Sequence, residues 1–271
     1  MAIAGTASAI LLGTATSARA TFTFTTNFTN VGHATKGDIF LDSVVIDDTQ
    51  EFIDDFSFVN GAIIVANDEY TGGNTGAASA DMGDYATTGV KVEAATPEAI
   101  VANLGNNNLN NIIDTEDSGS FQIDLTFAHM IDNLLVWERG NDRDAWGAGN
   151  SDLAVQAIDA DGNLIGNYLK INRNQWMNAG FSINTKEIRG NQEVGSLGVN
   201  IREDLGISGG TNRVRFFSEA GFRGPDWKFV GTDATRFEAE PRDIPEPGML
   251  LGLGAIAGAV LLKQRHTTPP V

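Results

Sequence analysis

The chain has 271 residues, of which 42% are hydrophobic, enough to bury the core of one large all-β domain or of two smaller domains. Its formal net charge of −17 argues against binding to nucleic acid or to an anionic membrane surface, because both interactions depend on attraction to negative phosphate groups. The absence of cysteine excludes disulfides, thiolate metal sites and a thiol nucleophile.

The first twenty residues are typical of a secretory signal peptide. Ala2–Leu12 is apolar and rich in small residues, and Ala18-Arg19-Ala20 has the Ala-x-Ala pattern of a signal-peptidase site. No basic residue precedes the apolar segment, so either the signal is atypical or the true start lies elsewhere. The alternative is a small-residue helix packed on the domain. We expect cleavage by signal peptidase between residues 20 and 21.

Directly after the predicted signal peptide, apolar and polar residues begin to alternate with a period of two. Thr21–Thr25 alternates threonine with phenylalanine, as a half-buried strand requires, and Asp38–Ile46 and Phe52–Val59 continue as predicted strands. Asn60-Gly61 predicts a two-residue hairpin turn into a strand over Ala62–Ala66, because type I′ turns need positive φ at both central positions.

A long polar stretch and a short helix come next. Residues 67–89 are rich in Gly, Ser, Thr and Asp and predict a surface loop. Thr96 is placed to cap a helix whose first turn contains Pro97, and Gly105 is placed to end it after Leu104.

The second half of the chain reads as short strands and turns. Phe121–Phe127 and Ile131–Trp137 predict two separate core strands, residues 139–151 predict a polar loop, and Leu153–Ile158 with Leu164–Ile171 predicts a hairpin. Polar connections are predicted at 106–111 and 114–117, and further strands at Val199–Arg202, Val214–Ser218 and Trp227–Val230. The expected fold is mainly β: a jelly-roll-like antiparallel β-sandwich with one short helix over residues 21–243, between hydrophobic signal helices at both ends.

The sequence has no HExxH, P-loop or GxGxxG motif, and its three histidines do not have metal-ligand spacing: His33, His129 and His266. Carboxylate pairs such as Asp54-Asp55 or Glu138 with Asp142 have the chemistry of a glycosidase. With 35 acidic residues in the chain, any one pair is uninformative. We therefore expect no catalysis, with a secreted hydrolase as an alternative.

Calcium is the metal that this composition suits best, because Ca²⁺ binds carboxylate and carbonyl oxygens. Asp159–Asn163 superficially resembles a calcium loop, but its spacing favours a tight hairpin turn. Six aspartates near the first strands have two interpretations, a calcium site formed across adjacent strands or, more simply, a charged outer face: Asp38, Asp42, Asp47, Asp48, Asp54 and Asp55. We expect no cofactor, with structural calcium as an alternative.

One loop combines an aromatic ring with hydrogen-bonding groups. Trp146 lies among Arg139, Asn141 and Asp142, the mixture that stacks on sugar rings and binds their hydroxyls. The chain is therefore also interpreted as a carbohydrate-binding module, with a loop anchor folded back on the sandwich as the alternative role of Trp146. The other tryptophans, Trp137, Trp176 and Trp227, lie in apolar patterns and are predicted to be core residues.

The last residues, 244–271, form a second targeting segment. Pro245-Glu246-Pro247 makes a stiff break, Met249–Leu262 is an uncharged apolar run, and Lys263 and Arg265 follow it. A helix over the apolar run covers roughly 21 Å at 1.5 Å per residue, which is shorter than a hydrocarbon core of about 30 Å. The length argues against a permanent anchor, and the absence of a polar face argues against a packed core helix.

This tripartite segment resembles the PEP-CTERM sorting signal of exosortase-processed bacterial surface proteins. The resemblance implies export, recognition of Pro245, Glu246 and Pro247 by a membrane-embedded sorting enzyme, transient membrane association and removal of the tail. With a signal peptide ending at Ala18-Arg19-Ala20, it leads us to expect a cell-surface or extracellular-matrix protein with a structural or adhesive role. The expected partners are signal peptidase, an exosortase-type enzyme and surface polysaccharide.

Overall fold

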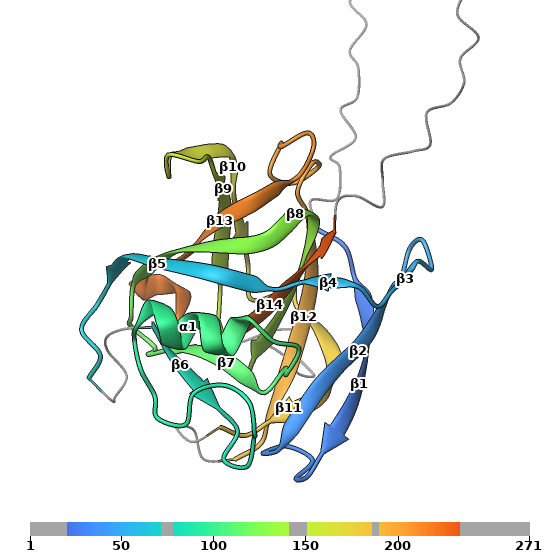
Figure 1. The fold of residues 1–271 in the computed structure, drawn as a ribbon, viewed down its shortest axis with the longest axis vertical. Coiled ribbons are helices and arrows are strands. Elements are labelled where there is room, and N and C mark those ends of the chain that lie inside the picture. Colours follow the sequence, from blue (N-terminus) through green and yellow to red (C-terminus); the bar gives the residue numbers. More distant parts are fainter. Residues whose placement is uncertain (1–20, 72–77, 141–150, 186–189, 234–271) are drawn as a thin grey trace, which may run out of the picture. The chain divides into compact units, whose positions relative to one another are not determined.

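The computed structural model describes residues 21–71, 78–140, 151–185 and 190–233 (Figure 1). Within these ranges the protein is mainly β, all strand pairs are antiparallel, and the one α-helix is α1, Pro97–Leu104. The predicted fold class is confirmed. The two hydrophobic helices expected at the ends of the chain lie outside the described residues.

The strands follow one another along the chain as β1 (Phe24–Val31), β2 (Asp38–Ile46), β3 (Phe52–Ile53), β4 (Phe56–Ser57), β5 (Val59–Asn67), β6 (Ala78–Met82), β7 (Asn111–Thr115), β8 (Phe121–Arg139), β9 (Leu153–Ile158), β10 (Leu164–Ile171), β11 (Met177–Ile183), β12 (Gln192–Asn200), β13 (Thr211–Ser218) and β14 (Trp227–Asp233). A 3₁₀ turn, η1 (Ala220–Phe222), precedes β14.

Strand β8 is shared by two sets of neighbours. Its first half pairs with β5 and β13, and its second half pairs with β12 and β14. At the changeover, residues 128–130 are exposed but remain part of the strand. The prediction of two separate strands, Phe121–Phe127 and Ile131–Trp137, is therefore wrong, because the exchange of partners needs no turn.

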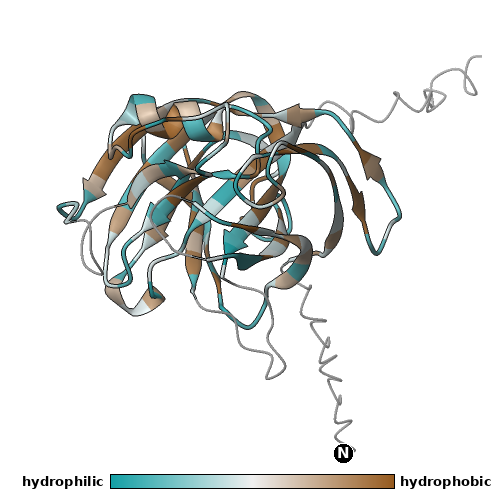
Figure 2. Cartoon of the chain, turned by 90° about the horizontal axis from the view of Figure 1, so that it is seen from below, coloured by the Kyte–Doolittle hydropathy of each residue, from teal (hydrophilic) through white to brown (hydrophobic). Residues whose placement is uncertain are grey.

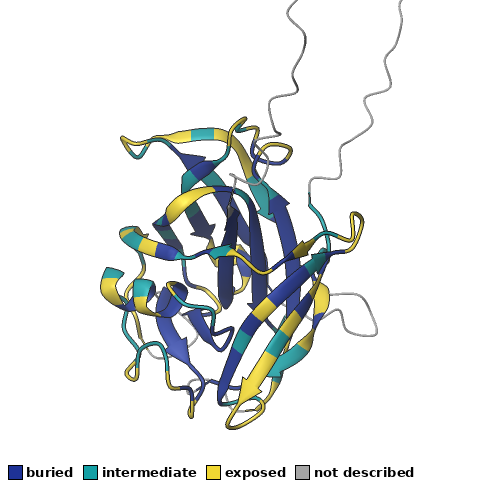
Figure 3. Ribbon diagram, turned by 45° about the vertical axis from the view of Figure 1, so that its right-hand side comes forward, coloured by how far each residue is buried: buried dark blue, intermediate teal, exposed yellow. Residues whose placement is uncertain are grey.

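The second half of β8 is buried on both faces. Leu134 and Val136 belong to a core that also contains side chains of β5, β9 and β13, whereas Leu135 and Trp137 pack against the separate sheet β1-β2-β3. Figure 3 shows the central strands of the larger sheet as mostly buried, whereas β1 and β2 carry buried and exposed positions. Figure 2 shows hydrophobic and hydrophilic residues interspersed along the strands. The Trp137 indole N–H donates to Thr26 Oγ1 at 3.0 Å, which satisfies its polar atom inside the second core.

The predicted hairpin at Asn60-Gly61 is wrong. Both residues lie inside β5, where the register with β8 shifts between Val59 and Gly61, and Gly61 does not adopt a positive φ. Ser57 of β4 pairs with β14 and not with β5. A β-bulge therefore uses the dipeptide that the local pattern assigned to a turn.

The predicted loop over residues 67–89 contains a core strand. All five residues of β6 are buried, and β6 pairs with β7, whose two ends lie in the stretches 106–111 and 114–117 that were predicted as polar connections. Ala78 and Ala80 pack in one core with Ile100 and Leu104 of α1. These small side chains let the helix approach the sheet closely, and short alanine and serine strands carry little pattern of their own.

Elements specified by local chemistry match the prediction. The Ala99 N–H donates to Thr96 Oγ1 at 3.2 Å at the start of α1, and the Gly105 N–H donates to the Val101 carbonyl at 2.7 Å at its end. β9 and β10 form the predicted hairpin, and the three tryptophans predicted as core residues are at most 1% exposed: Trp137, Trp176 and Trp227.

Gly198 of β12 offers a test of the packing at the start of the domain. Phe22 and Gly198 are paired by two backbone hydrogen bonds of 2.8 and 2.9 Å. A Cβ added at Gly198 would lie only 2.2 Å from the Phe22 ring. We expect Gly198→Ala to lower the free energy of unfolding in urea by roughly 1–3 kcal/mol through overpacking. Gly221→Ala is the control, because nothing lies within 4 Å of its Cβ position; equal stability of the two variants would contradict the expectation.

Candidate functional site

Most residues singled out from the sequence lie outside the described ranges. They belong to the sorting motif, the signal cleavage site and the loop between β8 and β9: Pro245, Glu246, Pro247, Ala18, Ala20, Trp146, Asn141 and Asp142. Arg139 is described, and the main cluster of buried charges surrounds it.

Arg139 was expected in a polar surface loop, and that placement is wrong. It is the last residue of β8 and only 2% exposed. Its guanidinium donates from Nη2 to Asp114 Oδ2 at 2.6 Å and to Asp226 Oδ2 at 2.6 Å, and from Nε to Asp226 Oδ2 at 2.9 Å. A buried guanidinium needs such partners, because desolvation of an unpaired charge is costly.

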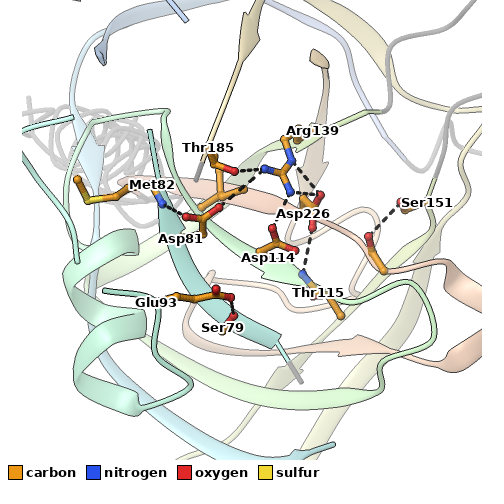
Figure 4. A network of polar contacts seen from close by, with 12 residues as sticks. Ser79, Asp81, Met82, Glu93, Asp114, Thr115, Arg139, Ser151, Thr185 and Asp226 are labelled. Carbon is orange, nitrogen blue, oxygen red and sulfur yellow. Dashed lines mark hydrogen bonds and ion pairs between the residues drawn. The ribbon is translucent and has the colours of Figure 1, made fainter. Parts of the chain in front are cut away.

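The carboxylates come from three separate segments (Figure 4). Asp114 lies in β7, Asp226 directly precedes β14, and Asp81 lies in β6 with its Oδ2 at 3.9 Å from Arg139 Nη1. Thr185, which follows β11, accepts a hydrogen bond from the same Nη1. One arginine therefore connects four elements that are distant in sequence.

Asp226 also links the end of β8 to β7 through hydrogen bonds that involve backbone groups. Its N–H donates to Glu138 Oε1 at 2.9 Å, its carbonyl accepts from the Arg139 N–H at 2.8 Å, and its Oδ1 accepts from the Thr115 N–H at 3.0 Å. Asp226 thus fixes the end of β8 through both the backbone and the side chain of Arg139.

The electrostatics follow from burial and charge. Burial works to lower the pKa of Arg139, but Asp226 and Asp114 outweigh it and raise the pKa, so Arg139 is charged. Burial raises the pKa of Asp226 well above its usual range, although Arg139 opposes the change. Burial, with a contribution from Asp114, raises the pKa of Asp81 to about 6. Asp81 therefore takes up a proton under mildly acidic conditions.

The cluster has the chemistry of a structural anchor. Asp81, Asp114 and Asp226 are 2%, 5% and 6% exposed, so in this conformation they are out of reach of a substrate. Within the described ranges, no group of three or more acidic or histidine side chains is arranged to hold a metal ion. The convergent carboxylates here surround an arginine, which does not favour the hydrolase alternative.

A second ionic cluster lies at the start of β9. Asp152 accepts from Arg173 Nε and Nη2, each at 3.0 Å, and pairs with Lys170 Nζ at 2.9 Å. Burial works to raise the pKa of Asp152, but the hydrogen bonds from Arg173 and Lys170 outweigh it and lower the pKa. Asp152 is therefore a stable anion beside Phe222, whose ring lies 4.4 Å from Lys170 Nζ.

The two clusters hold both ends of the loop predicted to bind glycans. On one side Arg139 is bonded to Asp226; on the other, Ser151 Oγ donates to the Arg223 carbonyl at 2.9 Å and the Asp152 N–H donates to the Phe222 carbonyl at 2.9 Å. Residues 222–226 are thus the common support for residue 139 on one side and residues 151–152 on the other.

The calcium candidates take part in ordinary turns and strand contacts. Asp159 Oδ1 accepts from the Asp161 and Asn163 N–H groups, each at 2.9 Å, as in a tight turn. Asp38 is buried, away from the predicted charged outer face, and accepts from Thr87 N–H at 2.8 Å. The other five aspartates of that set are exposed, two of them hydrogen-bonded to threonines: Asp42, Asp47, Asp48, Asp54 and Asp55.

The sequence did not predict a buried amide network at the end of α1 and in the segment that follows it. Asn103, Asn108, Asn110 and Asn111 are fully buried, although they lie in or beside a stretch predicted as a polar connection. Asn103 Nδ2 donates to the carbonyls of Asp81 at 2.6 Å and Ile112 at 2.8 Å, and Asn108 Oδ1 accepts from the Ile39 N–H at 2.9 Å. The run of asparagines was the only sign of this network in the sequence.

Comparison of the chain with protein-family models, with curated proteins and with solved structures gives no match. In the part of the chain that the structure describes, no helix has the length and apolar character needed to cross a membrane.

Asp81 predicts a measurable pH dependence. Its pKa is about 6 in the folded protein and 3.8 ordinarily, so the folded state binds the extra proton between about pH 4 and 6, and the Asp81 contribution to stability falls as pH rises through that window. We expect Asp81→Asn to be more stable than the wild type at pH 7 by up to roughly 3 kcal/mol, with the difference vanishing below about pH 4.

Urea unfolding at several pH values measures this difference. Exposed Asp48→Asn is the matched control and should follow the wild type at every pH. A stability difference for Asp81→Asn that does not change with pH would contradict the assignment.

Proposed function

We propose that the protein is an exported, exosortase-sorted component of the bacterial cell surface or extracellular matrix, with a structural or adhesive role and no catalysis. The observation that carries the proposal is the order of three features in the tail: Pro245-Glu246-Pro247, the apolar run Met249–Leu262, and the basic residues Lys263 and Arg265. The signal-like residues 1–20 supply the export step that such sorting requires.

The boundaries of the described domain support this proposal. Phe22, the second residue after the proposed signal-peptidase site, is paired with Gly198 through two backbone hydrogen bonds. At the other end, β14 ends at Asp233, and residues 234–244 separate it from the sorting motif. Cleavage at either proposed site would therefore leave every described strand intact.

The character of the domain supports a structural role. The buried charges of the Arg139 and Asp152 clusters are paired across distant elements. The acidic composition suits a soluble surface protein that has no disulfides. A polysaccharide matrix is the partner that we propose.

Mass spectrometry of protein recovered from the native host tests the sorting step. We expect the mature chain to lack Met249–Leu262, and Pro245→Ala, Glu246→Ala and Pro247→Ala to accumulate with the tail retained because the sorting enzyme no longer recognises them. Pro269→Ala, in the same tail but outside the motif, is the control and should be processed normally. Recovery of wild-type protein with its tail, in amounts independent of an exosortase gene, would sink the proposal.

A carbohydrate-binding role through Trp146 is the second candidate. It is favoured by the fixed ends of the loop, since a binding loop held at both ends loses less conformational entropy on binding.

For this candidate we expect Trp146→Ala to weaken binding to the host's surface polysaccharide by roughly tenfold, since losing a stacked ring costs on the order of 1.5 kcal/mol. Affinity electrophoresis with that polysaccharide measures the change. Tyr168→Ala is the control, because Tyr168 is an exposed aromatic residue on β10. Equal binding by wild type and Trp146→Ala would remove the loop from consideration.

A further inference from the structure

Lys228 in β14 is a buried lysine with no counter-charge among the described residues. Its side chain is 0% exposed, and burial alone lowers its pKa well below the ordinary value. Desolvation favours the neutral form of a lysine, and the neutral amine is the nucleophilic form. The network around Arg139 does not use this group.

The amine lies against a carboxamide at the end of α1. Lys228 Nζ donates to the Asn103 carbonyl at 2.5 Å and lies 3.4 Å from Asn106 Oδ1. Asn106 Nδ2 donates to the same Asn103 carbonyl at 3.3 Å. A shared acceptor therefore holds the amine and the amide side by side, which supplies the proximity that such reactions need.

The Asn106 carboxamide is also polarised. Its Oδ1 accepts a hydrogen bond from the Asn108 N–H at 2.8 Å and from Asn111 Nδ2 at 3.2 Å. Both donors come from the buried amide network, so they are fixed before any reaction. Donors directed at a carbonyl oxygen stabilise the negative charge that develops there when a nucleophile attacks its carbon.

We propose that Lys228 and Asn106 form an intramolecular isopeptide bond. The Nζ lone pair attacks Asn106 Cγ, and Oδ1 carries the negative charge of the tetrahedral intermediate. A proton passes from Nζ to Nδ2, the Cγ–Nδ2 bond breaks, and ammonia leaves. One amine and one primary amide thus become one secondary amide and ammonia, with no change in oxidation state and no co-reactant.

The bond would fasten β14 to the segment that follows α1. The bond would join residues 106 and 228. The closed loop would then contain β8 and two of its four partners, β12 and β13, and would end at the start of a third, β14. A purely non-covalent role, in which Lys228 only caps the last carbonyls of α1, is the competing account. The two accounts differ in covalent mass and hence can be separated, and neither depends on where the protein is sorted.

Peptide mapping of the full chain, folded and then denatured and digested with trypsin, tests the proposal. We expect peptides 92–139 and 224–236 to appear as one linked species, lighter than their sum by one ammonia, because trypsin does not cleave after an acylated Lys228. Lys228→Met and Asn106→Ala should abolish the linked species. Lys36→Met removes a surface lysine that pairs with Asp84, and should retain it.

Recovery of unlinked 92–139 and 224–228 from folded wild-type protein would overturn the proposal, and this result needs no variant to fold. Loss of ammonia within 92–139 without linkage to 224–236 would also overturn it, because that product is an asparagine succinimide. Fragmentation of the linked species locates the joined residues.

Discussion

The double use of β8 is the constraint on which the domain depends. The strand is paired along both edges, and its second half is covered on both faces, so its backbone groups and most of its side chains are satisfied inside the protein. Two cores meet on this strand. A register shift of one residue would move Leu135 and Trp137 from one core to the other, because successive side chains of a strand point to opposite faces.

The charged end of β8 extends that constraint to the loop between β8 and β9. Arg139 can be buried only because Asp114 and Asp226 reach it from β7 and the start of β14, and Asp226 in turn bonds the backbone of β8. Asp152 performs the same task at β9. Ion pairs and hydrogen bonds therefore fasten both ends of the loop to the sheet, a useful property for a contact surface of the kind proposed.

Local chemistry predicted part of the fold. The alternation of Phe121–Phe127, the cap at Thr96 and the turn at Asp159–Asn163 each involve neighbours in sequence, and each is found in the structure. β6 could not be predicted, because Ala, Ser and Asp become core residues only beneath α1. The hairpin predicted at Asn60-Gly61 is wrong for the same reason. Gly61 pairs with Thr126 of β8, a distant residue that no local pattern identifies.

The sequence by itself determined the mainly β class, and it carries the whole case for export and sorting, because those patterns are contiguous segments that a processing enzyme would also read locally. Only the tertiary structure decided which charges are buried and what they contact. Arg139 and Asp226 are 87 residues apart, and Lys228 and Asn106 are 122 apart. Contacts between residues so far apart in sequence depend on the topology of the chain. Charged residues that the sequence pattern assigned to the surface are therefore buried, and they hold the domain together.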